Sequence, residues 1–374
     1  MKKGILVYLP SDSSWIGGIY YVKNMAFQLS RSRAICNQYN IYVLTGSGYE
    51  DAYRTLPENV KIIVQNENGG VFEKARLLFA LLRANIAYVF PYENKLLAKF
   101  TKTIKWIPDF QHKHLPELFA SEELKGRDED IEKILKEQGA LVLSSRDCLR
   151  DLEQFYNPGG KEIHVIPFVS YIEQEVRSVD GTMEQKILEK FGLAGKRYVC
   201  IANQFWKHKN HIVVLKAIEK FFQEHSDSEA VFVFTGNLED RRNPEYIELL
   251  KEYFQNEQLE NRIRNLGFLD RTEQIIVMKK AEFIIQPSLF EGWGTVVEDC
   301  KVLDKTILLS DIPVHREQRN DKCVLFDPHN EDMLATIIHE ELCKTHSSDV
   351  AKGIADMYRR AQEYVKEFEK IVCR

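Results

Sequence analysis

Residues 286–318 read QPSLFEGWGTVVEDCKVLDKTILLSDIPVHREQ. The stretch predicts a buried strand, a Pro-Ser break, a glycine-rich loop, a helix start and a second strand with a polar, His-containing exit. A strand, a helix and a further strand in this order are typical of parallel α/β sheets. The stretch therefore predicts an α/β fold and places a polar loop between a strand and a helix.

The glycine loop of this stretch predicts a helix start that binds an anion. Gly294 lets the backbone come close to a ligand, and the amides of Gly294, Thr295 and Val296 are unpaired donors at the helix start. Phosphate groups are stabilised there. With Glu291 to accept hydroxyl groups, this layout can hold a sugar nucleotide. The alternative is a glycine turn followed by an acidic first turn of helix.

Helix geometry separates the two acidic residues of the predicted helix. If the helix begins near Thr295, its apolar stripe consists of Val296, Val297, Cys300 and Leu303. At about 100° per residue, Glu298 points roughly 160° away from that stripe. We therefore expect Glu298 to lie in solvent and Asp299, at the edge of the stripe, to face a cleft.

The bulk properties indicate a globular two-domain protein. The chain has 374 residues, 44% of them apolar, and a formal charge of −5, which gives no general reason to expect a nucleic-acid partner. Its seven cysteines are scattered without zinc spacing, which favours a reducing cytoplasm and predicts no metal site. The start of the chain reads as a first strand and no apolar run approaches the ~20 residues of a membrane span.

Short apolar runs alternate with helical patterns along the chain. In the first half, predicted strands lie at 4–10, 41–46, 61–65, 87–91, 103–108, 140–145 and 163–168. In the second half they lie at 197–202, 230–236, 262–268, 281–288, 306–311 and 323–328. Two such series predict two doubly wound domains with parallel sheets. We place these domains at 1–168 and 169–348, followed by a helix at 349–374 that packs on the second domain or crosses back to the first.

The segment PSLFEGWGTVVED resembles the signature of glycosyltransferase family 4, which are retaining enzymes with the GT-B fold. Glu291 matches the first acidic position of that signature. Asp299, eight positions later, stands where the family has its second Glu. The resemblance implies two Rossmann-like domains that face each other across a cleft. It also implies that Glu291 contacts the donor sugar and that Asp299 contacts the ribose.

Further segments extend the resemblance to the donor side. In ANQFWKHKNH (202–211), Lys209 matches a family lysine, whereas Gln204 stands at the position of a family Arg. Lys207, or an Arg elsewhere in the chain, can replace the charge of that Arg. The alternative for both lysines is a solvated loop. FVFTGN (232–237) resembles the strand that ends near the nucleotide and contributes Gly236.

The first half carries two weaker matches. Gly17 and Gly18 follow the first strand and open a helix, where a phosphate or an acceptor can bind; a plain strand-helix turn is equally consistent. In IPDFQHKHLPELF (107–119), Asp109 fits the family pattern but Pro108 stands at the position of its His. Gln111, His112 and His114 crowd the same loop, and we expect one of them, in the first place His112, to take that position near the donor sugar. The alternative is that these polar groups cap neighbouring backbone.

The resemblance implies a hexosyltransferase type of reaction. A nucleotide-diphosphate sugar is the donor, a glycan or lipid-linked molecule is the acceptor, and neither metal nor cofactor is needed. Surface polysaccharide assembly and a cytoplasmic location, at the inner face of the membrane, fit this function. The alternatives are a sugar-nucleotide epimerase or a phosphorylase on the same fold, and a non-catalytic binding subunit.

One basic stretch remains outside these matches. Residues 71–110 carry seven Lys or Arg against three acidic residues, beside an apolar run that includes Leu77, Phe79 and Leu82. This composition fits a peripheral contact of residues 71–105 with an anionic membrane. The alternative is a domain helix with its charged face in water.

Overall fold

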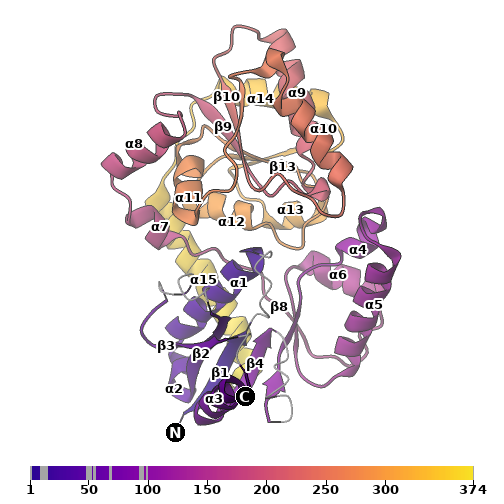
Figure 1. Cartoon of the computed structure of the whole chain (residues 1–374), viewed down its shortest axis with the longest axis vertical. Coiled ribbons are helices and arrows are strands. Elements are labelled where there is room, and N and C mark those ends of the chain that lie inside the picture. Colours follow the sequence, from indigo (N-terminus) through magenta and orange to yellow (C-terminus); the bar gives the residue numbers. More distant parts are fainter. Residues whose placement is uncertain are drawn as a thin grey trace. The chain divides into compact units, whose positions relative to one another are not determined.

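The computed structural model describes residues 2–8, 16–47, 53, 56–66, 70–91, 97 and 100–373. The chain forms two compact units (Figure 1). The first contains Met1–Phe110, Lys125–Val169 and Tyr358–Arg374, and the second contains Gln111–Leu124 and Ser170–Met357. The segment 111–124, which the sequence assigned to the first domain, groups with the second unit.

The first unit contains two parallel sheets. The larger has the order β3-β2-β1-β4-β5 and consists of β1 (Lys3–Tyr8), β2 (Tyr39–Gly46), β3 (Val60–Gln65), β4 (Ile86–Pro91) and β5 (Lys102–Thr103). The smaller has the order β6-β7-β8 and consists of β6 (Lys105–Ile107), β7 (Leu141–Leu143) and β8 (Ile163–Val165). The helices are α1 (Ile16–Arg31), α2 (Arg33–Gln38), α3 (Val71–Arg83), α5 (Ser121–Lys136), whose first turn belongs to the second unit, and α6 (Arg146–Phe155).

The second unit is built on one six-stranded parallel sheet with the order β11-β10-β9-β12-β13-β14. Its strands are β9 (Tyr198–Ala202), β10 (Val231–Thr235), β11 (Ile263–Asn265), β12 (Ile284–Gln286), β13 (Ile307–Ser310) and β14 (Cys323–Phe326). Its helices are α4 (Gln111–His114), α7 (Glu173–Arg177), α8 (Gly181–Lys190), α9 (His211–Glu224), α10 (Pro244–Phe254), α11 (Arg271–Lys280), α12 (Thr295–Leu303), α13 (Pro313–Gln318) and α14 (Glu331–Leu342). Short 3-10 turns lie at Pro116–Leu118, Lys207–Lys209 and Glu257–Leu259.

Two inner strands of this sheet, β9 and β10, are covered on both faces. Every residue of β9 and β10 is buried, so these strands read as continuous apolar runs. On one face, Phe221 of α9, Leu250 of α10 and Ile338 of α14 share an apolar cluster with the strands. Each predicted strand lies within a few residues of an observed one, and the α/β fold class is confirmed.

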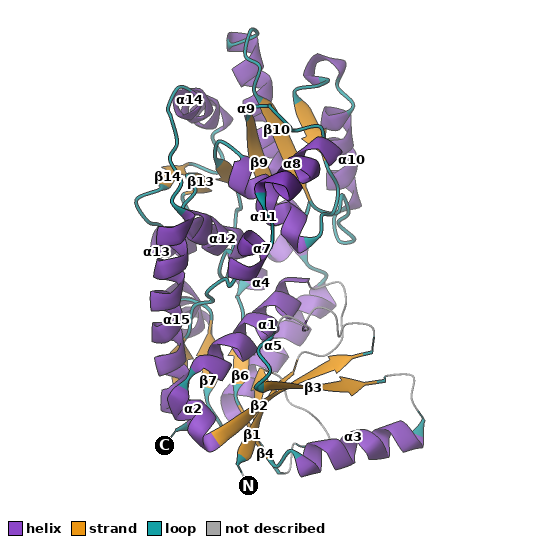
Figure 2. Cartoon of the chain, turned by 90° about the vertical axis from the view of Figure 1, so that its left-hand side faces the viewer, coloured by secondary structure: helices purple, strands orange, loops and turns teal. Residues whose placement is uncertain are grey.

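The last helix, α15 (Val350–Val372), begins in the second unit and ends in the first. In the second unit, Gly353 lies so close to the backbone of α12 that a Cβ atom there would sit 2.1 Å from the carbonyl oxygen of Val302. In the first unit, Ser32 Oγ donates to Glu369 Oε1 over 2.5 Å and Tyr39 Oη donates to the carbonyl of Val372 over 2.8 Å. Figure 2 shows α15 as one uninterrupted helix. None of the helices within the described residues is both long and apolar enough to cross a membrane.

The close approach at Gly353 predicts that this helical glycine cannot be replaced. We expect Gly353→Ala to lower the free energy of unfolding by about 3 kcal/mol, because the new methyl group meets backbone that cannot move aside. The matched control is Gly126→Ala in α5, where a Cβ atom meets nothing within 4 Å. That control should gain roughly 0.5–1 kcal/mol from helix propensity. Urea unfolding of both variants checks the prediction, and equal midpoints would contradict it.

Candidate active site

The candidate site lies where two loops leave the carboxyl edge of the sheet in the second unit. One loop follows β9 and carries Lys209, and the other follows β12 and carries Glu291. The two strands are neighbours in the sheet. Chain connections run from β9 toward β10 and from β12 toward β13, which lie on opposite sides. Ligands of open α/β sheets bind at such a reversal of strand order.

Glu291 and Lys209 form an ion pair at this position. Lys209 Nζ lies 2.6 Å from Glu291 Oε1, and their side chains are only 14% and 9% exposed. The same oxygen also accepts hydrogen bonds from Gln286 Nε2 at 2.9 Å and Ser288 Oγ at 2.7 Å. Burial alone would raise the pKa of Glu291, but the charge and the hydrogen bond of Lys209 outweigh it and lower the pKa to about 2. Glu291 is therefore a carboxylate at neutral pH.

Buried polar side chains support the Glu291 loop. Gln286 is 1% exposed and accepts a hydrogen bond from Asn203 Nδ2 over 2.8 Å. Ser310 Oγ donates to the carbonyl of Ser288 over 2.5 Å, and His315 Nδ1 donates to the carbonyl of Ser310 over 2.9 Å. Burial lowers the pKa of His315, so its imidazole is neutral. Strands β12 and β13 and helix α13 thus hold the Glu291 loop together.

Gln318 fixes the start of α12. Its Oε1 accepts a hydrogen bond from the Gly294 amide over 3.0 Å, and its Nε2 donates to the Gly294 carbonyl over 3.0 Å. A Cβ atom at Gly294 would lie 3.1 Å from Gln318 Oε1 and 3.7 Å from His315 Nε2, so the glycine permits this close packing. Because the Gly294 amide is engaged, the amides of Thr295, which is exposed, and of the buried Val296 remain as donors at the helix start.

The expectation for Glu298 was wrong. Its side chain is fully buried, not solvated, and its Oε1 accepts hydrogen bonds from Lys301 Nζ at 2.7 Å and Gln318 Nε2 at 3.1 Å. The stripe argument assumed that one face of α12 is wet, but α13 brings Gln318 onto that face. Asp299 is also buried, at 1% exposure, and its Oδ1 accepts from Ser170 Oγ at 2.5 Å and Arg271 Nη2 at 2.6 Å. The structure thus places Asp299 in a closed polar cluster and not on an open surface.

The β9 loop is tied to the end of β10 by two predicted residues. Gly236 has a φ of +138°, and a Cβ atom there would lie 2.2 Å from the carbonyl oxygen of Asn203. Gln204 Oε1 accepts a hydrogen bond from the Asn237 amide over 2.9 Å. Lys207 points elsewhere, since its Nζ lies 3.5 Å from Glu245 of α10 and both side chains are exposed. Of the two loop lysines, Lys209 is the one bonded to Glu291.

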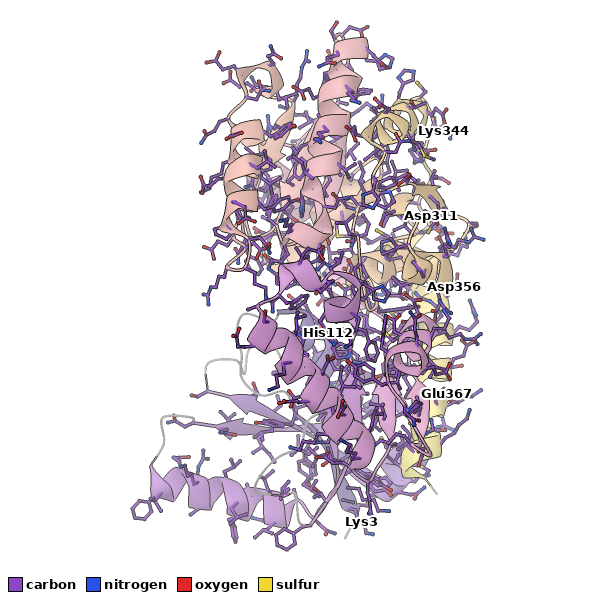
Figure 3. All side chains as sticks on the ribbon, turned by 90° about the vertical axis from the view of Figure 1, so that its right-hand side faces the viewer. Lys3, His112, Asp311, Lys344, Asp356 and Glu367 are labelled. Atoms are coloured by element: carbon purple, nitrogen blue, oxygen red, sulfur yellow. The ribbon has the colours of Figure 1, made fainter. Side chains whose placement is uncertain are left out.

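The loop with His112 groups with the second unit through its aromatic and charged side chains. His112 is buried, with 2% of its surface exposed. Figure 3 labels His112 among the side chains of the protein. The ring of its neighbour His114 lies 5.1 Å from the ring of Phe290, the residue before Glu291. Arg242 Nη2 donates to Glu123 over 2.5 Å, and its guanidinium lies 4.8 Å from the Phe119 ring.

The remaining predicted residues lie in the first unit. Asp109 has its Oδ1 3.8 Å from Arg127 Nη1. Gly17 and Gly18 form the first turn of α1, which follows β1 in the chain, and Gly18 is buried.

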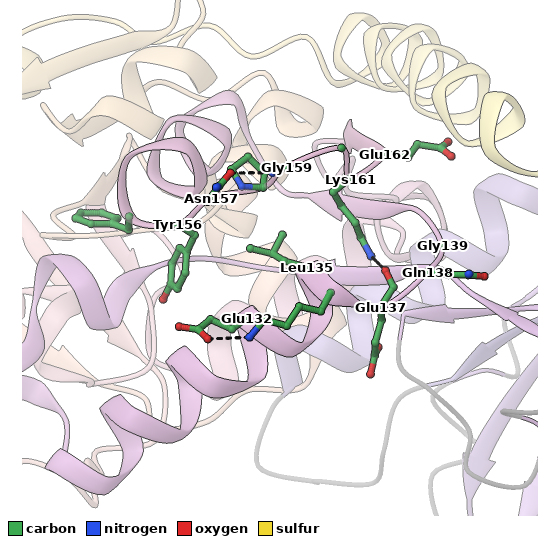
Figure 4. Close-up of a pocket in the computed structure, with 14 residues that line it drawn as sticks. Glu132, Leu135, Glu137, Gln138, Gly139, Tyr156, Asn157, Gly159, Lys161 and Glu162 are labelled. Carbon is green, nitrogen blue, oxygen red and sulfur yellow. Dashed lines mark hydrogen bonds and ion pairs between the residues drawn. The ribbon is translucent and has the colours of Figure 1, made fainter.

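A hollow in the first unit does not coincide with the candidate site. A hollow of about 690 Å³ in the first unit is lined by the end of α5 and by the turn before β8 (Figure 4). Lys161 in its wall donates to the carbonyls of Ile134 and Glu137 over 2.7 Å each. The hollow adjoins the amino ends of β7 and β8, and none of the predicted site residues lines it. Within the described part of the chain there is no cluster of three His, Cys, Asp or Glu side chains that could hold a metal ion.

Sequence reasoning missed the supporting residues of the site. Gln286, Ser288, Ser310, His315 and Gln318 all lie inside the 286–318 stretch. The sequence contains two signals for them. One is a glutamine at the end of a buried strand, and the other is a His and a Gln three positions apart after the next strand. Each predicts a polar side chain that needs a buried partner.

Buried imidazoles near Lys209 predict acid sensitivity. His211 is fully buried, and burial together with the Lys209 charge lowers its pKa to about 3. In the unfolded chain the histidine has a pKa of about 6.5, so it binds a proton below that pH, whereas the folded protein keeps it neutral. Protonation of the unfolded state therefore lowers the free energy of unfolding as the pH falls below about 6.5. We expect the wild type to lose about 2 kcal/mol more between pH 7 and pH 5 than His211→Phe does.

Urea midpoints of the wild type and His211→Phe at both pH values measure this difference. His329→Gln is the matched control, because His329 is exposed. This control should follow the wild type. A wild-type and a His211→Phe protein with the same pH dependence would contradict the prediction.

Comparisons with known proteins bear on the fold and on the class of enzyme. Residues 183–352, a little under half of the chain, match the family described as glycosyl transferases group 1. No match was found among curated protein sequences. The fold resembles Anabaena HepE in complex with UDP and glucose, with 15% identity, a TM-score of 0.69 and 99% coverage of both chains. It also resembles a glycosyltransferase from Rickettsia africae, with 17% identity, a TM-score of 0.65 and coverage of 98% of this chain and 94% of that one.

A third similar structure is an α,α-trehalose-phosphate synthase (UDP-forming) from Burkholderia vietnamiensis, with 13% identity, a TM-score of 0.65 and 98% coverage of both chains. At these identities the likeness shows the fold alone, and the predicted GT-B fold is confirmed. The family match of residues 183–352, taken with this fold, supports the predicted enzyme class, so the chain is a glycosyltransferase with the GT-B fold.

Proposed function

We propose that this glycosyltransferase moves a hexose-type sugar from a nucleotide-diphosphate donor to a glycan or lipid-linked acceptor, with retention of anomeric configuration and without a metal ion. The observation that carries the proposal is the buried Lys209–Glu291 pair beside the start of α12. It combines a fixed carboxylate, a fixed cation and a helix N-terminus, which together suit a sugar attached to a diphosphate.

The two oxygens of Glu291 differ in a way that fits sugar binding. Oε1 accepts the bonds from Lys209, Gln286 and Ser288, whereas no hydrogen bond to Oε2 occurs among the described residues. Oε2 is therefore the oxygen that accepts a donor-sugar hydroxyl. Because Oε1 is held by three donors, the carboxylate is positioned before the substrate binds. Such preorganisation costs nothing at the moment of reaction.

The leaving diphosphate is bound by positive groups of the same loops. Lys209 Nζ and the amides of Thr295 and Val296 stabilise the charge that grows on it as the sugar becomes oxocarbenium-like. Fixed donors aimed at developing charge are usually the largest catalytic contribution. The leaving phosphate itself takes the proton of the acceptor hydroxyl. Gln204 and Gly236 keep the neighbouring loops in place.

The other predicted residues have supporting roles in this proposal. His112 and Asp109 orient the donor sugar, with His112 in place of the absent family histidine. Asp299 shapes the ribose side through its bonds to Ser170 and Arg271. Gly17 and Gly18 belong to the acceptor side.

A UDP-sugar is the first donor to test, because the similar HepE structure holds UDP and glucose. We place the enzyme at the cytoplasmic face of the membrane, in surface polysaccharide assembly. A thermal-shift screen with UDP-, GDP- and dTDP-sugars identifies the donor, since a ligand at 100 times its Kd stabilises by about 2.7 kcal/mol. Nucleotide release that depends on an added acceptor then supports transfer. Conversion of the donor alone would favour an epimerase, and binding without turnover would favour a non-catalytic subunit.

The Glu291 carboxylate is predicted to be essential for turnover. We expect Glu291→Gln to lower kcat by roughly 10²–10³-fold, because a neutral amide cannot stabilise the positive charge that develops on the sugar. Initial rates of nucleotide release with saturating donor and acceptor measure the effect. A rate near that of the wild type would overturn the proposed role.

A double variant separates catalysis from stability. Glu291→Gln alone leaves the Lys209 charge buried without its partner, which costs about 3–5 kcal/mol when the charge stays dry. Lys209→Met combined with Glu291→Gln removes both charges, so the unfolding midpoint should recover while turnover stays low. Recovery of turnover together with stability would show that the pair has only a structural role.

A further inference from the structure

Helix α3 carries two apolar faces, of which only one is packed. Leu77 is 8% exposed and Leu81 is fully buried, and both belong to an apolar cluster with the strands of the first unit. Phe72, Phe79 and Leu82 are 93%, 68% and 56% exposed. At about 100° per residue, the mean direction of these three side chains is roughly 160° from that of Leu77 and Leu81. The helix lies at the periphery of its unit (Figure 2).

The exposed face serves no purpose within the described fold. Single exposed apolar residues are ordinary, but a contiguous exposed patch marks an interaction surface. Val71, at the start of the same helix, is 82% exposed and extends the patch to the first turn. Burial of Leu77 and Leu81 already attaches α3 to the sheet. The outward aromatic residues therefore point to a partner.

Positive charges border this outward face. Arg76 and Arg83 are exposed and lie within about 60° of Phe79 around the helix, on one side of the stripe. Lys74 is also exposed, but it lies about 130° from the middle of the stripe, near the direction of Leu81. Glu73 is the one acidic residue of the helix, and it pairs with Arg76 over 2.8 Å. An apolar stripe bordered by cations is the composition of helices that lie in a membrane interface.

We propose that the outward face of α3 docks on an anionic lipid surface. Phe72, Phe79 and Leu82 enter the boundary between head groups and acyl chains, and Arg76 and Arg83 contact acidic head groups. This narrows the contact predicted from residues 71–105 to one helix face; Lys95 and Lys99 of that stretch lie outside the described residues. The contact is independent of the sugar-transfer chemistry.

Charge and size favour a lipid surface over a second copy of the chain. A two-fold dimer would set the same patch against itself and bring the cations of both helices together. A helix face of 13 residues is about 20 Å long and ~10 Å wide, well below the ~800 Å² that each partner buries in a standard interface. Neither objection applies to an anionic membrane. Its acidic head groups complement the positive charges, and its interior accepts a small number of apolar side chains.

Vesicle flotation with the full-length protein tests the proposal. The probes are vesicles of phosphatidylcholine with about one third phosphatidylglycerol, and vesicles of phosphatidylcholine alone. We expect binding to the anionic vesicles that weakens at high salt, since exposed charges are screened. Phe72→Ser combined with Phe79→Ser should lower the partition coefficient at least tenfold, and Arg76→Gln combined with Arg83→Gln should remove the preference for anionic lipid.

The matched control changes exposed apolar residues of the second unit. Leu249 and Met333 are each 40% exposed, so Leu249→Ser combined with Met333→Ser removes exposed apolar surface elsewhere and should bind like the wild type. Equal binding by the Phe72/Phe79 variant and the wild type would overturn the proposal. So would a concentration-dependent dimer that this variant abolishes, because the partner would then be a second copy. Flotation needs no turnover, so its failure would leave the glycosyltransferase assignment untouched.

Discussion

The candidate site depends on the reversal of strand order at β9. This strand pairs with β10 on one side and β12 on the other, and the chain leaves the two central strands β9 and β12 in opposite directions. The loops that follow β9 and β12 therefore diverge and leave a crevice at the carboxyl edge of the sheet. Lys209 and Glu291, 82 positions apart in the chain, meet there over 2.6 Å. No local propensity produces that encounter, since it follows from the topology of the sheet.

A nearly buried ion pair requires further polar partners, because removing two charges from water is costly. The 286–318 stretch supplies many of them. Gln286 ends β12, Ser288 opens the loop, Ser310 ends β13, and His315 and Gln318 lie on α13. Hydrogen bonds through Ser288 and Ser310 connect the Glu291 carboxylate to His315. Gln318 holds the Gly294 backbone through two further hydrogen bonds. The segment 286–318 thus contributes both Glu291 and the side chains that hold the Glu291 loop in position.

The parts that the sequence predicts are those with a local signal. Val- and Ile-rich runs located the strands, and the match at Glu291 and Lys209 identified two residues that the structure brings together. The prediction that Glu298 lies in solvent failed because its burial depends on Gln318, twenty positions away in the chain. The helical period of α12 carries no information about that contact. The assignment of residues 111–124 to the first domain failed for the same reason, because their grouping with the second unit is not a local property. It depends on contacts such as those of Arg242 with Glu123 and Phe119, more than 100 positions away in the chain.

The charges of this protein occupy two electrostatic environments that respond differently to salt. Lys209 and Glu291 are mostly withdrawn from solvent, so mobile ions cannot approach either charge closely. Arg76 and Arg83 of α3 are exposed, and at physiological ionic strength their fields fall off over about 8 Å. Fixed geometry suits the first environment, where a carboxylate must keep one position through a reaction cycle. Screened, exposed charge suits the second, where contact with a fluid surface must be reversible and needs no defined atom-to-atom geometry.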